Sequence, residues 1–227
     1  RDVRNPDKVP GASDSQQACL SYYPVFLDLR GRRCVVIGGG PVATEKARAL
    51  VDADAHVDII ASRPIPKLET LPVRLFYRGY QHGDLVGALL AIDTTGDARV
   101  REEAEAQHVL LNVVDTPAEC DFIAPAVVRR GPLQVAVSTS GESPYLAGHI
   151  RNRLEAAYGA EWADFVRLTG SIRRGLRRRG VSVGRQKVVY EMLLRSEVRD
   201  LLREGAVEAA QRQANTIVDW VLNEVAV

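Results

Sequence analysis

Residues 33–43 read RCVVIGGGPVA, and this stretch decides the fold. Residues 33–37 are almost continuously apolar, as expected of a strand buried on both faces of a parallel sheet. Three glycines, residues 38–40, follow the strand. Pro41 then begins a helix that we predict over residues 41–53, because a missing backbone N–H costs nothing in the first turn. A strand, a glycine turn and a helix in this order predict the first βα unit of a dinucleotide-binding fold.

The glycine turn itself matches the pattern G-x-G-x-x-A over residues 38–43. In this pattern Gly38 permits the tight turn, Gly40 lets the backbone approach a pyrophosphate, and Ala43 allows the helix to pack closely on the strand. The phosphates would lie at the positive N-terminus of the helix. A glycine-rich connection that binds no ligand is the alternative interpretation.

The rest of the chain continues the βα alternation and then changes character. We predict further strands over residues 56–60, 73–77, 88–92 and 109–114, a helix over 98–107, two antiparallel strands over 122–129 and 133–138, and a helix over 144–158. The fold class is therefore α/β, a Rossmann-like parallel sheet followed by a small strand-containing dimerisation segment and a helical C-terminal domain. The predicted divisions are a flexible segment 1–20, an NAD-binding domain 21–116, a dimerisation and substrate segment 117–158, and a helical domain 159–227.

Nucleotide preference is left open by the residues that follow the second strand. An acidic residue usually binds the adenosine ribose of NAD at this point, but the sequence reads Ala61-Ser62-Arg63. Asp58 is expected inside the strand, where it is poorly placed for that bond. Ser62 could reach the ribose of NAD, whereas Arg63 could meet the 2′-phosphate of NADP.

Polar residues also follow the fifth strand. Asn112 and Asp115 lie at its carboxyl end, where open α/β sheets form their ligand crevice. Strand alternation would turn the two side chains to opposite faces, unless the strand has ended and Asp115 turns over the cofactor. Asp115 is either a candidate catalytic carboxylate or an ordinary turn residue.

A hydroxyl-rich turn enters the helix at residue 144. Its side chains and N–H groups could bind the carboxylates of a ligand, while the alternative is a plain helix cap with Pro144 in the first turn. The candidate substrate-binding residues are Ser138, Thr139, Ser140 and Ser143. An arginine cluster over residues 173–179 is a second candidate for carboxylate binding, although such runs often only face solvent.

Composition excludes several classes of function. The formal net charge is +1, so there is no global charge argument for nucleic acid or a membrane surface. No apolar run approaches the length of a membrane span, and the first residues have no signal-peptide core, so we expect a soluble cytoplasmic protein. The three cysteines (Cys19, Cys34 and Cys120) lack metal-ligand spacing, and no metal site or disulfide is predicted.

Three longer stretches together resemble one family, the precorrin-2 dehydrogenases, which include the dehydrogenase/ferrochelatase half of siroheme synthase. The stretches are YPVFLDL at 23–29 with CVVIGGGPVATEKAR at 34–48, NVVDTP at 112–117 with FIAPA at 122–126, and VAVSTSGESP at 135–144. The resemblance covers about residues 22–168, and the ordered combination is far more specific than the glycine pattern alone.

The resemblance implies a homodimer that oxidises precorrin-2 to sirohydrochlorin with NAD, on the way to siroheme. It assigns the catalytic carboxylate to Asp115, a site role to Asn112, and cofactor contacts to the positions of Pro41, Val42, Ser62 and Arg63, beside Gly38, Gly39 and Gly40. Iron insertion into sirohydrochlorin is a second activity of some family members. A non-catalytic NAD(H)-sensing domain is the rival hypothesis, and it would not need Asp115 for turnover.

Overall fold

The computed structural model describes residues 22–224, so the predicted flexible segment 1–20, with Cys19, lies outside the described residues. The described chain divides into two compact units, residues 22–124 and 125–224. Residues 117–124 therefore belong with the first unit, whereas the sequence predicted a division after residue 116.

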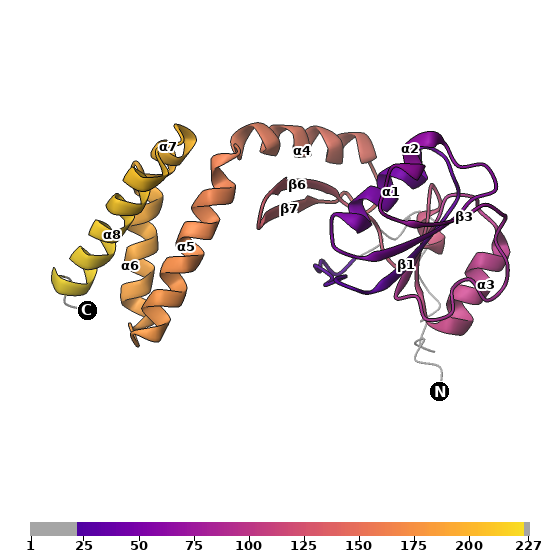
Figure 1. Cartoon of the computed structure of the whole chain (residues 1–227), viewed down its shortest axis with the longest axis horizontal. Coiled ribbons are helices and arrows are strands. Elements are labelled where there is room, and N and C mark those ends of the chain that lie inside the picture. The colour runs from indigo at the N-terminus through magenta and orange to yellow at the C-terminus, as the bar shows by residue number, and fades with distance from the viewer. Residues whose placement is uncertain (1–21, 225–227) are drawn as a thin grey trace, which may run out of the picture. The chain divides into compact units, whose positions relative to one another are not determined.

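Five short strands form the sheet of the first unit, in the order β3-β2-β1-β4-β5. Figure 1 labels β1 and β3 of this sheet. Their bounds are Arg33–Ile37 for β1, His56–Ile60 for β2, Arg74–Phe76 for β3, Leu90–Asp93 for β4 and Leu110–Val113 for β5. Every adjacent pair is parallel, so all five carboxyl ends meet at one edge of the sheet. The predicted Rossmann-like α/β fold is confirmed.

Helices cover both faces of this sheet, which is why its strands are apolar throughout. Their bounds are Pro41–Val51 for α1, Pro66–Glu69 for α2 and Ala98–Gln107 for α3. Val36 packs with Ala47 of α1 on one face. Its neighbour Val35 packs with Val100 of α3 on the other face, as strand alternation requires.

Two local expectations differ from the structure. Helix α1 ends at Val51 rather than at residue 53, because the chain turns at Asp54, which has a left-handed φ of 58°. The fifth strand ends at Val113, so Asp115 is not a strand residue and strand alternation does not set its direction. The short helix α2 and the 3₁₀ turn η1, Pro117–Glu119, had no sequence signal beyond their prolines.

The second unit begins with the predicted antiparallel strand pair, although the first strand starts at Ala126 and not at residue 122, and it is otherwise helical. The bounds are Ala126–Arg130 for β6, Leu133–Val137 for β7, Pro144–Ala157 for α4, Glu161–Arg178 for α5, Val183–Arg195 for α6, Val198–Arg203 for α7 and Val207–Glu224 for α8. Helices α5 to α8 share their own apolar core, which includes Phe165, Leu193 and Val221. Within residues 22–224, no helix has both the length and the apolar character to cross a membrane.

Candidate dinucleotide and catalytic site

The carboxyl edge of the sheet carries the predicted site, and hydrogen bonds tie its neighbouring turns together. Both the N–H and the hydroxyl of Thr94, after β4, donate to Ile37 O at the end of β1, each over 2.9 Å. The Val114 N–H, after β5, donates to Asp93 O over 2.9 Å. The turns after β1, β4 and β5 therefore form one continuous rim.

The three glycines of the turn after β1 differ in the space that a Cβ atom would have at each position. Gly38 has a φ of 117°, and a Cβ there would lie 2.0 Å from the hydroxyl of Thr94. A Cβ on Gly39 would lie 2.8 Å from Pro64 Cα. A Cβ on Gly40 would meet nothing within 4 Å. Gly38 and Gly39 are thus required by the protein itself, whereas the space above Gly40 is open for a ligand.

The N-terminus of α1 has the features of an anion site. Gly40 caps the helix without any side-chain hydrogen bond. Within the described residues, no acceptor takes the N–H groups of Val42 and Ala43. Val42 is 43% exposed although it is apolar, and Ala43 is fully buried against the sheet. These residues fit a dinucleotide, because free N–H groups at a helix start bind phosphate oxygens.

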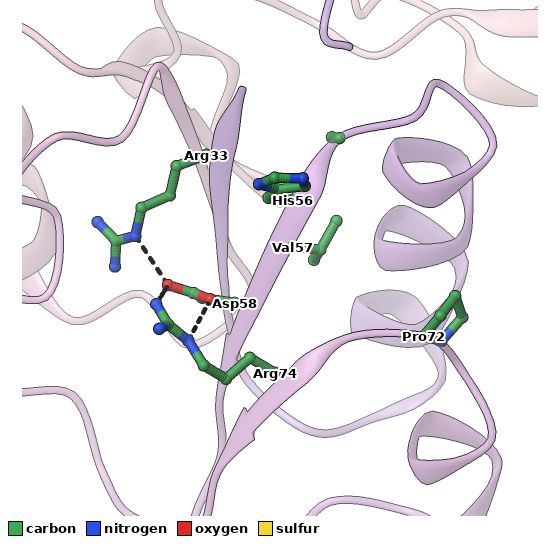
Figure 2. A pocket seen from close by; sticks show the side chains of 7 residues that line it. Arg33, His56, Val57, Asp58, Pro72 and Arg74 are labelled. Carbon is green, nitrogen blue, oxygen red and sulfur yellow. Dashed lines mark hydrogen bonds and ion pairs between the residues drawn. The ribbon is translucent and has the colours of Figure 1, made fainter. Parts of the chain in front are cut away.

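The end of β2 supplies exposed polar side chains but no carboxylate. Ser62 and Arg63 are both exposed there. Asp58 lies inside β2, as predicted, and Figure 2 shows it held by two arginines. Arg33 Nε lies 2.8 Å from Asp58 Oδ2, and Arg74 binds the same carboxylate through both oxygens. Asp58 is therefore engaged in joining β1, β2 and β3.

The hollow in Figure 2 lies away from the rim. It has a volume of about 330 Å³ and is lined by residues at the starts of β1, β2 and β3, among them Arg33, His56 and Arg74. In parallel α/β sheets, ligands bind at the carboxyl ends of the strands. The hollow is thus at the opposite edge from the predicted site.

Asp115 projects from a tight turn directly after β5. The Thr116 N–H donates to Val113 O over 3.3 Å, which closes a turn with Asp115 at its third position. Asp115 is exposed and has a φ of 63°, in the left-handed region that Asp and Asn adopt more readily than most residues. The strand has therefore ended before Asp115, and a position of its carboxylate over the cofactor stays a prediction.

The side-chain amide of Asn112 is hydrogen-bonded within the protein. It is 7% exposed, and its Nδ2 donates to Phe122 O over 3.0 Å and to Cys120 Sγ over 3.4 Å. These bonds connect β5 to the segment that returns along it. Asn112 is therefore buried and hydrogen-bonded within the protein, whereas Asp115, three residues later, is exposed.

The hydroxyls of residues 138–143 lie in the second unit, between β7 and α4, and largely hold their own turn. Ser143 caps α4 by accepting from Leu146 N over 3.2 Å, as the plain-cap interpretation predicted. Thr139 Oγ1 accepts from Ser143 N, and Ser138 Oγ accepts from Ser140 N. Ser140 has a φ of 53°, and no internal bond of its hydroxyl is seen within residues 22–224.

The arginine cluster lies on the second half of α5 and just beyond it. Its members are exposed, and none forms an ion pair within the described part of the chain. They are Arg173, Arg174, Arg177, Arg178 and Arg179. Arginines near a helix C-terminus also favour its negative end, so a ligand role stays a prediction.

Two family models match the chain in sequence. The model described as "Putative NAD(P)-binding" covers residues 25–126, and the model described as "Sirohaem biosynthesis protein central" covers residues 130–157. The siroheme synthase of Ectopseudomonas mendocina (strain ymp) is 36% identical over 199 residues, and that of Azotobacter vinelandii is 37% identical over 205. This chain is similar to the N-terminal half of siroheme synthase. The first unit is accordingly its NAD(P)-binding domain.

The match to siroheme synthases is nearly complete for this chain but partial for the relatives. Each of these two alignments covers 85% of this chain and 43% of the relative, so the chain spans less than half the length of the siroheme synthases it matches. The solved structure of "SirC, precorrin-2 dehydrogenase" has the same fold. Its TM-score is 0.65 at 24% identity, covering 87% of this chain and 99% of that one.

One polar segment of the sheet edge was not predicted from the sequence. Asp93 is the last residue of β4, and Thr94 and Thr95 follow it beside the glycine turn. This is the switch point where the strand order reverses between β1 and β4. Asp93 is buried and accepts from the N–H and hydroxyl of Thr95 and from Gly96 N. A polar run directly after an apolar strand was the available signal.

Proposed function

We propose that this chain catalyses the NAD-dependent dehydrogenation of precorrin-2 to sirohydrochlorin. The single observation that carries the proposal is the shared rim, on which Asp115 and the dinucleotide-binding glycine turn lie at the same sheet edge. The relatives named siroheme synthase and the structural neighbour named precorrin-2 dehydrogenase support the same reaction.

The reaction removes one hydride and one proton from the substrate. NAD, when bound, accepts the hydride. The Asp115 carboxylate takes the proton from the substrate and releases it to water, so positive charge does not build up on the macrocycle. The sum is precorrin-2 and NAD⁺ giving sirohydrochlorin, NADH and H⁺.

The cofactor would cross the rim from β2 to β5. Ser62 and Arg63 would meet the adenosine ribose, and the N–H groups of Val42 and Ala43 would hold the phosphates. Three interstrand spacings, about 14 Å, separate β2 from β5, so the nicotinamide end would lie toward Asp115. We propose NAD as the oxidant, and the exposed Arg63 makes NADP the comparison to run.

The decisive assay follows the absorbance of precorrin-2 under anaerobic conditions with purified protein and NAD, with NADP in parallel. Conversion to sirohydrochlorin is the expected result. Added Fe²⁺ then tests whether the same protein also makes siroheme. Tight NAD binding without any conversion would overturn the enzyme proposal and favour the NAD(H)-sensing hypothesis.

Replacement of Gly40 by alanine should separate cofactor binding from folding. Its backbone φ of −89° suits alanine, and no protein atom lies within 4 Å of the added methyl group. The methyl group would fill the space proposed for the phosphates, so we expect the Kd for NADH to rise at least about tenfold, or about 1.4 kcal/mol. Fluorescence titration measures the Kd, and thermal unfolding should be unchanged.

The matched control for Gly40→Ala is Gly175→Ala. Gly175 is another glycine whose added methyl group would meet nothing within 4 Å, and it lies on α5 in the other unit. NADH should bind to this control as it does to the parent protein. An unchanged Kd in Gly40→Ala would argue against the phosphate position.

Carboxylate binding by the turn before α4 is the second element of the proposal. Precorrin-2 carries many carboxylates, and the N-terminus of α4 presents N–H groups beside the hydroxyls of Ser138, Thr139, Ser140 and Ser143. The Ser140 hydroxyl is the best of the four, since the other three hold the turn.

We also propose that two copies associate through the second unit, in the cytoplasm. Helix α4 exposes apolar side chains, with Tyr145 86% and Leu146 47% exposed. Sedimentation should give a dimer, and Leu146→Glu should shift it toward the monomer. A strictly monomeric species with full activity would contradict the proposal.

A further inference from the structure

We infer that Cys120 and Asn112 are positioning residues that clamp the turn carrying Asp115. This inference rests on the proposed dehydrogenation, in which Asp115 is the base. It assigns to both residues an indirect role, through the backbone conformation of residues 113–116, and no contact with the substrate.

The Cys120 sulfur touches both ends of the Asp115 turn. Its Sγ accepts from Val113 N over 3.2 Å, and it lies 3.2 Å from Val113 O and 3.4 Å from Thr116 O. Its one proton is donated to one of these two carbonyls. Burial raises the pKa of the Cys120 thiol, so the proton stays on the sulfur at neutral pH. The thiol thus links the residues that bracket Asp115.

Asn112 secures the same sulfur from the strand side. Its Nδ2 donates to Cys120 Sγ and to Phe122 O, which fixes the thiol relative to β5. One residue away, Asp121 N donates to Leu111 O over 2.8 Å, and Asp121 Oδ2 accepts from Leu111 N over 3.0 Å. Residues 111–122 therefore form a loop closed at its base, which we call the Asp115 loop.

A clamp is needed because the turn is conformationally demanding. A non-glycine residue with positive φ persists when surrounding contacts determine its backbone. The Val113–Thr116 turn has a single backbone hydrogen bond of its own, at 3.3 Å, within the described residues. Contacts from Cys120 to both Val113 and Thr116 supply the missing restraint. Small displacements of a catalytic group lower kcat strongly, so the restraint has a kinetic consequence.

Cys120→Ala tests the clamp, with Cys34→Ala as the matched control. Both cysteines are free. Cys34 is fully buried in β1 and its sulfur bonds to Arg32 O, not to the turn that carries Asp115, so its replacement lowers stability without removing the clamp bonds. We expect Cys120→Ala to lower kcat about 10- to 100-fold with an unchanged Kd for NADH. We expect Cys34→Ala to keep the parent kcat.

Two further variants distinguish positioning from general destabilisation. Cys120→Ser retains one donor and one acceptor at the same place and should recover most of the lost kcat. Asn112→Ala should lower kcat as well, and the double variant Asn112→Ala/Cys120→Ala should lose less than the product of the two single losses, since both act on one loop. Equal kcat in Cys120→Ala and Cys34→Ala would overturn the inference.

Hydrogen exchange gives a readout that is independent of turnover. The amides of Val113 and Thr116 should exchange faster in Cys120→Ala than in the parent protein, while amides of β1 should not. If the parent protein fails to convert precorrin-2, the proposed function falls, and exchange still decides whether the clamp holds the loop. Unchanged exchange at both amides would show that Cys120 does not restrain the Asp115 loop.

Discussion

Asp115→Asn should lower kcat for precorrin-2 oxidation about 10²- to 10⁴-fold, the usual contribution of a general base. Asparagine has nearly the same shape, and it adopts the left-handed conformation observed at Asp115 without added strain. The substitution therefore removes the proton acceptor and leaves the turn in place. The Kd for NADH and the thermal unfolding temperature should both stay at the parent values. Anaerobic absorbance assays, fluorescence titration and thermal unfolding provide the three measurements.

Glu119→Gln is the control for charge in the same loop. Glu119 is exposed in η1, four residues beyond Asp115, and its replacement also removes one negative charge. Its kcat should match that of the parent protein. If Asp115→Asn also retained the parent kcat, Asp115 would be an ordinary turn residue and another group would have to accept the proton.

The asparagine variant is preferable to alanine for a structural reason that the sequence did not give. The sequence placed Asp115 at a strand end, but its positive φ depends on where β5 stops and on the turn that follows. An alanine at this φ would add backbone strain to the loss of the carboxylate. A fall in kcat would then have two causes.

The first βα unit was predicted closely because local signals there agree with one another. Strand β1 has the predicted bounds 33–37, and α1 begins at Pro41 as expected. The apolar run, the glycines and the proline each act within a few residues of where they occur. Gly38 differs, because the residue that it approaches closely, Thr94, lies more than fifty residues further along the chain.

Contacts between distant segments explain what was not predicted. Asn112 was predicted as a site residue from its place at the carboxyl end of β5 and from the family resemblance. Its bonds to Cys120 and Phe122, which return along β5 only after η1, were not predicted. Likewise, Thr94 became a neighbour of the glycine turn only through the pairing of β1 with β4. Neither arrangement has a periodic signature in the sequence.

Glu103 is the clearest residue whose contacts with a distant segment were not predicted. Its replacement should have the largest effect on stability. The sequence of α3 is strongly polar, yet the Glu103 side chain is completely buried. Its carboxylate accepts from Gly83 N and Leu85 N, each at 3.0 Å, and from the hydroxyl of Tyr80. Burial and this carboxylate raise the pKa of Tyr80, which keeps the phenol a donor.

Glu103→Ala would remove the carboxylate that accepts from two buried donors, the Leu85 N–H and the Tyr80 hydroxyl. Each unsatisfied buried group costs about 1–3 kcal/mol, so we expect the free energy of unfolding to fall by about 3–5 kcal/mol. Urea denaturation followed by circular dichroism measures the change. Glu102→Ala is the control, because Glu102 is the exposed neighbour on the same helix, and it should change stability by less than about 0.5 kcal/mol.

Glu103 is also connected to the predicted site. The segment held by Glu103 leads directly into β4, whose carboxyl end carries Thr94 of the rim. Glu103→Gln retains one acceptor oxygen but brings an NH₂ group against backbone donors, so its loss should lie between the parent protein and Glu103→Ala. Equal stability of Glu103→Ala and Glu102→Ala would mean that water replaces the carboxylate. The fold of the first unit would then rest on apolar packing alone at this point.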